Sequence, residues 1–149
     1  VSGVPTQQVG GEEDLIQQHR DQLTSERKAI DAFVAERGWP VQTGGTGWRM
    51  WRVEAGTGSQ LQTDDGVELT AQATDLRRKT FYTYRADEPL AFRLGRDNVG
   101  EIGLHEVLLQ CRRGDSLVVI LPAHLAHGVA GDLGKIPPMS PVVYYLRVR

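Results

Sequence analysis

The stretch that decides the fold is 114-GDSLVVILPAHLAHG-128, followed closely by 134-GKIPPM-139. Residues 116–121 form a short apolar run rich in β-branched side chains, opened by a Gly-Asp turn and closed by Pro122, which is typical of a buried strand. The glycine-rich loop after Pro122 has little capacity to form ladders and is expected to cross the surface. Residues 142–148 are predicted to return as a second strand, so the loop would form the rim of a concave site.

Two pieces of this loop carry a family resemblance. Residues 121–128 (LPAHLAHG) and 135–138 (KIPP) resemble the signature loop of FKBP-type peptidyl-prolyl cis-trans isomerases, whose pattern is roughly Ile-Pro-x-x-Leu-Ala-Tyr-Gly, a spacer and Ile-Pro-Pro. The resemblance extends over residues 48–149. It implies a bent antiparallel sheet wrapped around a short helix, with the active pocket between them.

The same segment, taken without the resemblance, is predicted to be strands with one helix. Alternating apolar residues and β-branched runs predict strands at 48–53, 67–73, 80–84 and 89–94, and helical spacing predicts a short helix within 99–111. With the two strands of the signature region, five or six antiparallel strands and this helix make an α+β fold. Together with the resemblance, this pattern leads us to expect that residues 48–149 form one domain, which the resemblance implies is of the FKBP isomerase type.

The first 47 residues are expected to precede that domain. Residues 1–11 lack periodicity and predict a flexible leader. Residues 12–47 predict an amphipathic helix that starts at the acidic residues from Glu12, is interrupted near Thr24, and ends in a hinge. Its apolar stripe consists of Leu15, Ile16, Leu23, Ile30, Phe33 and Val34. Packing of this stripe against the sheet is the favoured hypothesis, and pairing with a second copy of the chain is the alternative.

Net charge and apolar content indicate which kinds of partner to expect. The formal net charge of -2 and the pI near 6.1 give no basic field, so nucleic acid is not an expected partner. No stretch approaches the roughly 20 apolar residues of a membrane-spanning helix. The single cysteine, Cys111, cannot form an internal disulfide and is expected to be a buried structural thiol.

The reaction implied by the resemblance needs no cofactor and no nucleophile. Rotation about an X-Pro bond crosses a barrier of about 18–20 kcal/mol because amide resonance is lost in the twisted state. A pocket accelerates it by binding the twisted form better than either planar isomer. Aromatic and aliphatic walls with one or two hydrogen-bond donors suffice for this.

Position by position, the resemblance implies a set of pocket residues. The expected catalytic residues are His127, Phe81 and Tyr82. The expected substrate-binding residues are Phe92, Val99, Leu104, Ile136 and Tyr144.

Several of these positions depart from the family pattern. Tyr82 stands where the family has aspartate, Leu104 where it has tryptophan, and His127 where it has tyrosine, while the usual tyrosine of the second strand is replaced by Ala71 or Ala73. Reduced isomerase activity is one expectation, and a catalytically inactive binding or chaperone module is the alternative. His127 can still donate a hydrogen bond from its ring and could hold the substrate carbonyl. If His127 lines the pocket where the family has tyrosine, a His127→Tyr variant is expected to gain activity or inhibitor affinity.

Two other kinds of site were weighed. His124 and His127 lie three residues apart with Asp132 nearby, but a third firm ligand is missing and we expect no metal. Asp115, Ser116 and His124 do not form a hydrolase site, because no nucleophile elbow surrounds Ser116.

The preceding helix, together with Arg37-Gly-Trp-Pro-Val41, is similar to a subgroup of lipid-anchored FKBP proteins of the bacterial cell envelope, some of them linked to gliding motility. This resemblance implies a periplasmic or outer-membrane-anchored lipoprotein, with a lipid anchor upstream of Val1. The expected partners are proline-containing polypeptides, with a homodimer through the N-terminal helix left open.

Overall fold

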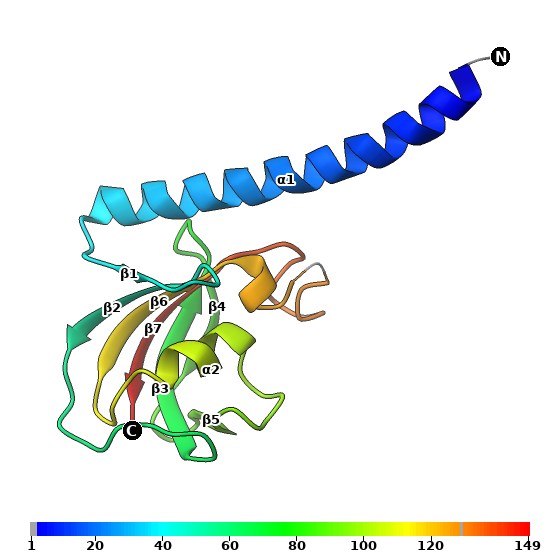
Figure 1. The fold of residues 1–149 in the computed structure, drawn as a ribbon. Helices are drawn as coiled ribbons and strands as arrows, with labels where there is room; N and C mark the ends of the chain where they lie inside the picture. The colour runs from blue at the N-terminus through cyan, green and yellow to red at the C-terminus, as the bar shows by residue number, and fades with distance from the viewer. Residues whose placement is uncertain (1–2, 129) are drawn as a thin grey trace.

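The computed structural model describes residues 3–128 and 130–149, with side chains from residue 11 onward. A long helix precedes a sheet that bends around a short second helix (Figure 1). The elements in chain order are α1 (Gly3–Arg37), β1 (Gln42–Thr43), β2 (Arg49–Glu54), β3 (Gly66–Thr74), β4 (Thr80–Tyr84), β5 (Leu90–Arg93), α2 (Ile102–Leu108), β6 (Ser116–Leu121), the 3₁₀ turn η1 (Ala123–Leu125) and β7 (Val142–Val148).

The sheet is antiparallel, with the strand order β1-β2-β6-β7-β3-β4. The nine-residue strand β3 pairs with β5 along its first half and with β4 along its second half, which bends the sheet around α2. This confirms the α+β fold. The sheet has seven strands rather than five or six, because the expected hinge contains the two-residue strand β1 paired with β2.

Both faces of the central strands are buried. On β6, Leu117, Val119 and Leu121 face the core that contains α2, whereas Val118 and Ile120 face a second core on the opposite side of the sheet. Because a strand buried on both faces has apolar residues without alternation, the continuous apolar run at 116–121 was a correct strand prediction.

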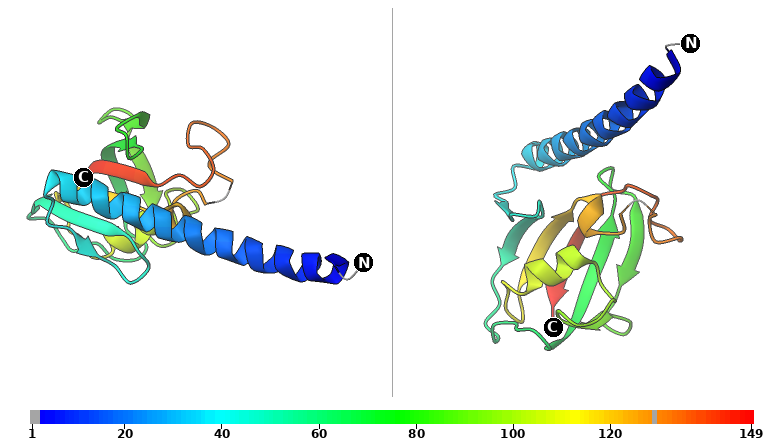
Figure 2. Two further views of the ribbon diagram at one scale, coloured as in Figure 1. Left: turned by 90° about the horizontal axis from the view of Figure 1, so that it is seen from above. Right: turned by 45° about the vertical axis from the view of Figure 1, so that its right-hand side comes forward.

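The second core is where α1 meets the sheet. Ile30 and Phe33 of α1 are buried there against Val118 and Val143, with Trp39 packed at the edge. The N-terminal part of α1 extends away from the sheet (Figure 2). Leu15 and Ile16 are exposed, and Leu23 is 40% exposed beside Pro122 and His124. Packing against the sheet therefore accounts for the C-terminal part of the apolar stripe and not for its N-terminal part.

Two polar contacts fasten α1 to the rest of the chain. The Glu26 carboxylate accepts the backbone N–H of Ala123 at 3.0 Å. The Arg49 guanidinium donates to Asp31 at 2.9 Å. The first of these contacts connects α1 directly to the start of the signature loop.

Helix α1 differs from the prediction at its start. It begins at Gly3 rather than Glu12, so the acidic residues lie inside the helix and none is in its first turn. It is also continuous through Thr24. The expected leader therefore lies largely within α1, except for residues 1–2, which are outside the described residues.

Helix α2 is shorter than the predicted helical segment, and it packs closely against β6 and η1. A Cβ atom on Gly103 would lie 2.4 Å from Leu121 Cδ2 and 3.1 Å from the carbonyl oxygen of Leu125. A larger residue at this position would force Leu121 or Leu125 to shift, so packing favours a glycine that would weaken an isolated helix. Cys111 is fully buried just after the helix, as expected, and burial raises the pKa of its thiol to about 11.

The turn before β6 is organised by a buried carboxylate. Asp115 accepts the backbone N–H groups of Gly56 at 2.6 Å and Arg112 at 2.9 Å, and it pairs with Arg52 at 3.1 Å. Burial favours the neutral acid, but these hydrogen bonds and the arginine outweigh it and lower the pKa of Asp115. Asp115 therefore joins the start of β6 to Gly56 in the loop after β2.

Replacing Gly103 by alanine tests this packing. We expect Gly103→Ala to lower the free energy of unfolding by about 1–3 kcal/mol, because overpacking against β6 and η1 outweighs the better helix propensity of alanine. Urea unfolding is the measurement. Gly11→Ala is the matched control, since nothing lies within 4 Å of a Cβ at that position of α1, and it should be neutral or stabilising. A Gly103→Ala protein as stable as the parent would contradict the packing argument.

Candidate functional site

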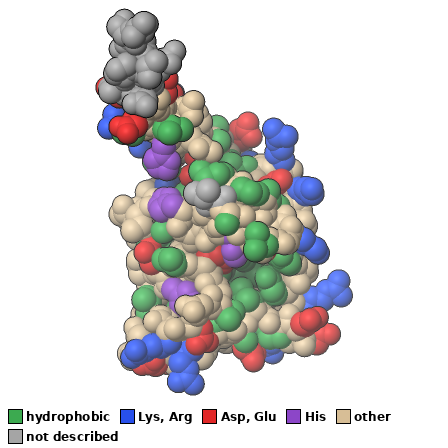
Figure 3. Space-filling view, turned by 90° about the vertical axis from the view of Figure 1, so that its right-hand side faces the viewer, with side chains coloured by type: hydrophobic (Ala, Val, Ile, Leu, Met, Phe, Trp, Pro, Cys, Tyr) green, Lys and Arg blue, Asp and Glu red, His purple; other side chains and the backbone are tan. Residues whose placement is uncertain are grey.

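A cavity of about 230 Å³ opens at one end of the bent sheet, where the signature loop returns over the segment before α2. Its walls come from β4, the start of β5, β7, the segment before α2 and the loop between η1 and β7. The lining residues are Tyr82, Tyr84, Leu90, Val99, Gly100, Glu101, His127, Asp132, Ile136 and Tyr144. On the face that carries this loop, histidine and hydrophobic side chains lie near one another (Figure 3).

The structure brings together five of the eight residues expected from the sequence. The expected residues that line the cavity are Tyr82, Val99, His127, Ile136 and Tyr144. Phe81, Phe92 and Leu104 are buried in the core and are not among the lining residues. For these three, a role in substrate contact stays a prediction, and their observed role is packing.

The segment that leads into α2 is held by His105. The backbone N–H of Gly95 donates to His105 Nδ1 at 2.8 Å, so the proton sits on Nε2, which donates to the carbonyl oxygen of Val99 at 2.9 Å. The His105 ring also packs on Phe92 with a centroid distance of 4.6 Å. One side chain therefore fixes both ends of the loop that carries Val99.

Gly100 turns the chain so that Glu101 lines the cavity. Its φ of 78° lies in the left-handed region, and a Cβ there would be 3.1 Å from the ring of Phe92. Both observations require glycine. The buried Phe92 therefore contributes to the site by supporting the backbone next to Glu101.

Glu101 joins His127 to Tyr144. Its Oε1 accepts a hydrogen bond from His127 Nε2 at 2.9 Å and a second from the Tyr144 hydroxyl. The hydrogen bond to Glu101 raises the pKa of His127 and outweighs the opposing effect of burial. Burial and the neighbouring Glu101 raise the pKa of Tyr144 well above 10, so its phenol remains a donor.

Asp132 organises the loop across the cavity. It accepts the Tyr82 hydroxyl at 2.5 Å and the backbone N–H groups of Gly134 at 2.8 Å and Ile136 at 2.9 Å. Burial opposes ionisation, but these three hydrogen bonds lower the pKa of Asp132. The Tyr82 to Asp132 contact attaches β4 to the loop that carries Ile136.

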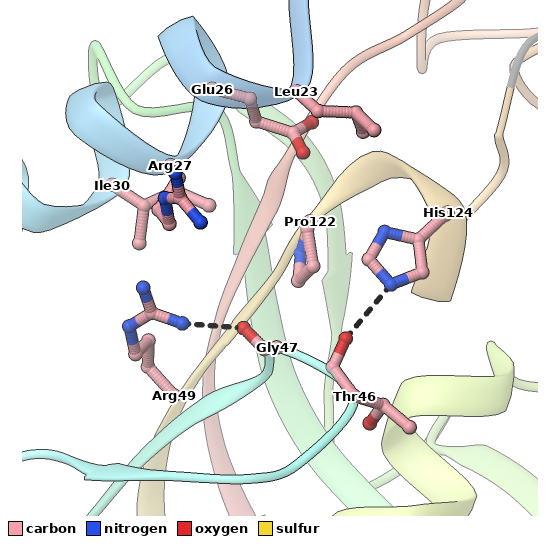
Figure 4. Close-up of a pocket in the computed structure, with 9 residues that line it drawn as sticks. All are labelled: Leu23, Glu26, Arg27, Ile30, Thr46, Gly47, Arg49, Pro122 and His124. Carbon is pink, nitrogen blue, oxygen red and sulfur yellow. Dashed lines mark hydrogen bonds between the residues drawn. The ribbon is translucent and has the colours of Figure 1, made fainter. Parts of the chain in front are cut away.

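A second cavity, of about 200 Å³, lies between α1 and the start of the signature loop. Figure 4 shows Leu23, Glu26 and Ile30 of α1 facing Pro122 and His124 across it. His124 bonds the carbonyl oxygen of Thr46 at 2.9 Å and is not among the residues that line the first cavity.

The structure therefore separates the histidines of the metal hypothesis. His124 is engaged with Thr46, whereas His127 and Asp132 line the first cavity. Across the described residues, no three His, Cys, Asp or Glu side chains are grouped to hold a metal ion. The second cavity lies between α1 and the domain, whereas the first is lined by residues of the domain alone.

Glu101 is the residue that sequence reasoning missed. It lay inside the segment expected to be a helix, where a glutamate is normally solvated, and its side chain is 3% exposed. The available signal was its position directly after a glycine and directly before the apolar helix. That signal does not distinguish a buried carboxylate from an ordinary N-terminal helix residue.

Comparisons with known proteins agree with this geometry. The model of the family described as FKBP-type peptidyl-prolyl cis-trans isomerase matches residues 58–149. The protein named FKBP-type peptidyl-prolyl cis-trans isomerase FkpA, from Escherichia coli strain K12, is 36% identical over 115 residues, which are 76% of this chain and 40% of the relative. The chain thus spans about two fifths of the length of the curated relatives it matches.

Solved structures extend the likeness to the fold. The crystal structure of FkpA from Escherichia coli superposes with a TM-score of 0.71 at 26% identity, covering 99% of this chain and 71% of that one. A peptidyl-prolyl cis-trans isomerase from Pseudomonas syringae pv. tomato superposes with a TM-score of 0.69 at 23% identity, covering 87% and 92%. The expected FKBP-like arrangement is therefore confirmed. No helix among the described residues is long and apolar enough to cross a membrane.

The pair between His127 and Glu101 predicts a pH dependence of stability. Because folding raises the pKa of His127 above its ordinary value near 6.5, the pair's contribution is complete below about pH 6.5 and is lost as pH rises through the raised pKa. We expect the free energy of unfolding to decline over that range in the parent. In His127→Gln, which keeps an N–H donor without a titrating charge, the decline should be smaller.

Urea unfolding at a series of pH values is the measurement. His19→Gln is the control, since His19 is exposed on α1 and distant from Glu101 in the chain. Equal pH slopes for the parent and His127→Gln would show that this pair contributes nothing to the linkage.

Proposed function

Because the chain belongs to the family of FKBP-type peptidyl-prolyl cis-trans isomerases, we propose that it catalyses rotation about X-Pro bonds in polypeptides of the bacterial cell envelope and so assists their folding. The observation that carries the proposal is the cavity itself. It is built from the family's signature loop, and Ile136, Tyr144 and Val99 supply the aliphatic and aromatic walls. Its volume of about 230 Å³ equals that of roughly eight water molecules, which leaves room for a prolyl ring and its flanking amide.

His127 is the proposed hydrogen-bond donor to the substrate carbonyl. Its Nε2–H is committed to Glu101, and no hydrogen bond to Nδ1 is found among the described residues. The protonated ring carries a second N–H on Nδ1, which can donate to a carbonyl that rotates out of the amide plane. The neutral ring cannot, because its one proton stays on Nε2 facing Glu101. Protonated His127 is therefore the active form in this proposal.

The other expected residues take supporting roles. Tyr82 acts through Asp132, which orders the loop that carries Ile136. Phe81, Phe92 and Leu104 support the wall from the core.

An exchange assay on N-acetylated X-Pro peptides tests both activity and mechanism. We expect acceleration of cis-trans exchange by micromolar protein, measured by NMR, with kcat/KM declining as pH rises through the raised pKa of His127. His127→Tyr should keep a donor that does not titrate in this range, so its rate should be higher at pH 8 and nearly independent of pH. Absence of acceleration at every pH would overturn catalysis.

A second candidate function is a binding or chaperone module without catalysis. The observation that favours it is the charged group at the cavity, because Glu101 and Asp132 stand in a pocket whose chemistry requires neither. Ionised groups favour a polar ligand over a twisted amide that has lost its resonance charge. Chemical-shift changes on peptide addition without faster exchange would support this function.

The finer assignments to an envelope subgroup are also proposals. Support for a lipid-anchored, periplasmic or outer-membrane location comes from the resemblance of residues 12–41 to the lipid-anchored proteins, including those linked to gliding motility. Labelling with a radioactive fatty acid in the source bacterium tests it. Loss of label when the sequence upstream of Val1 is deleted is expected, and an unlabelled full-length protein would contradict it.

Pairing of α1 with a second copy is proposed for its N-terminal part alone. Leu15, Ile16 and Leu23 are exposed, whereas Ile30 and Phe33 are occupied by the sheet, so removing all of α1 would also damage the domain. We expect light scattering to give a dimer mass for the parent and a monomer mass for Leu15→Glu combined with Leu23→Glu. Gln18→Glu is the matched charge control. A monomer mass for the parent would exclude the dimer.

A further inference from the structure

The cavity contains an unpartnered buried acceptor. The Glu101 side chain is 3% exposed, and its Oε1 accepts both the His127 and the Tyr144 hydrogen bonds. Among the described residues, its Oε2 has no hydrogen-bond partner. A buried carboxylate oxygen without a donor is unfavourable, so this atom indicates a group that the site receives from outside.

Asp132 does not share this property. Its Oδ2 accepts the Tyr82 hydroxyl, and its Oδ1 accepts the two backbone N–H groups of Gly134 and Ile136. Asp132 therefore adds negative charge to the cavity without offering an unused oxygen. Glu101 Oε2 is the acceptor that an incoming donor would use.

The aromatic lining favours a cation as that donor. Tyr82, Tyr84 and Tyr144 all line the cavity, and the Tyr82 and Tyr84 rings lie 6.2 Å apart. One of these rings already takes part in such a contact, since the ammonium of Lys135, which is not a lining residue, lies 5.4 Å from the centre of the Tyr82 ring. Tyrosine faces attract an ammonium group because of their ring quadrupole.

Because Glu101 Oε1 is already occupied, the site favours an ammonium group over a guanidinium group. A guanidinium binds a carboxylate best through two parallel hydrogen bonds, which need both oxygens. Glu101 Oε1 already accepts two donors, so only Oε2 remains. A compact ammonium needs a single acceptor and can direct its other N–H groups to neighbouring oxygens.

From these contacts we propose that the cavity recognises an alkylammonium group of a polypeptide, with Glu101 as its counter-ion. The ammonium belongs either to a lysine next to the proline or to the N-terminus of the bound polypeptide. This inference rests on the proposed function only in taking a polypeptide segment as the occupant. It makes lysyl-prolyl segments the preferred substrate class, with the prolyl ring against Ile136 and Val99.

Three peptides separate the sources of the ammonium. They are N-acetyl-Ala-Lys-Pro-Phe-amide, the same peptide with norleucine in place of lysine, and the norleucine peptide with a free N-terminus. NMR titration gives the dissociation constant of each, and exchange spectra of the same samples give the isomerisation rate. We expect the acetylated lysine peptide to bind about tenfold more tightly than the acetylated norleucine peptide. Tight binding of the free-amine norleucine peptide alone would assign the site to N-termini.

Variants identify the carboxylate. In Glu101→Gln the ratio of the lysine to norleucine dissociation constants should approach one, whereas Glu88→Gln, an exposed change of the same charge, should preserve it. If Glu101→Gln fails to fold, the parent still decides, because acetylating the lysine side chain must abolish the preference. Equal affinities of the parent for all three peptides would overturn the proposal.

These measurements distinguish failure of the ammonium site from failure of the proposed isomerase activity. Equal acceleration and equal binding of lysine and norleucine peptides would overturn the ammonium site and leave the isomerase intact. Selective binding of the lysine peptide without acceleration of any peptide would support the site and overturn catalysis.

Discussion

The close contact between α2 and the sheet is the constraint on which the candidate site depends. At Gly103 the helix lies so close to Leu121 and Leu125 that a Cβ atom there would be 2.4 Å from Leu121 Cδ2. This contact fixes the start of α2, and with Gly100 it holds Glu101 inside the domain rather than at the surface. Leu125 of η1 also lies beside Gly103, so the same packing helps to position both the signature loop and the buried carboxylate.

The sequence predicted the fold well where local pattern and burial agree. The run at 116–121 identified β6 because a strand buried on both faces has no polar alternation, and the alternation at 67–73 gave the buried face of β3. It predicted less at two places. Helix α1 continues to Gly3 across glycine-rich sequence that lacks the apolar periodicity of a helix, and β1 exists only because β2 lies beside it.

The candidate site was predicted in part for a similar reason. The signature loop located His127, Ile136 and Tyr144, since these positions follow from the motif and its returning strand. The burial of Glu101 depends on Phe92, His105 and Tyr144, which are separated along the chain and meet only in the folded protein. The cavity therefore contains a buried carboxylate beside the expected aliphatic and aromatic walls, and no local sequence pattern predicts it.

Both the proposed catalysis and the proposed ammonium site require that a polypeptide binds in the cavity around Glu101. A crystal structure of the chain with an acetylated lysyl-prolyl peptide tests it most directly. The expected result is a peptide whose prolyl ring lies against Ile136 and Val99 and whose lysine nitrogen lies within hydrogen-bond distance of Glu101. A peptide seated in the other cavity, between α1 and His124, would contradict it.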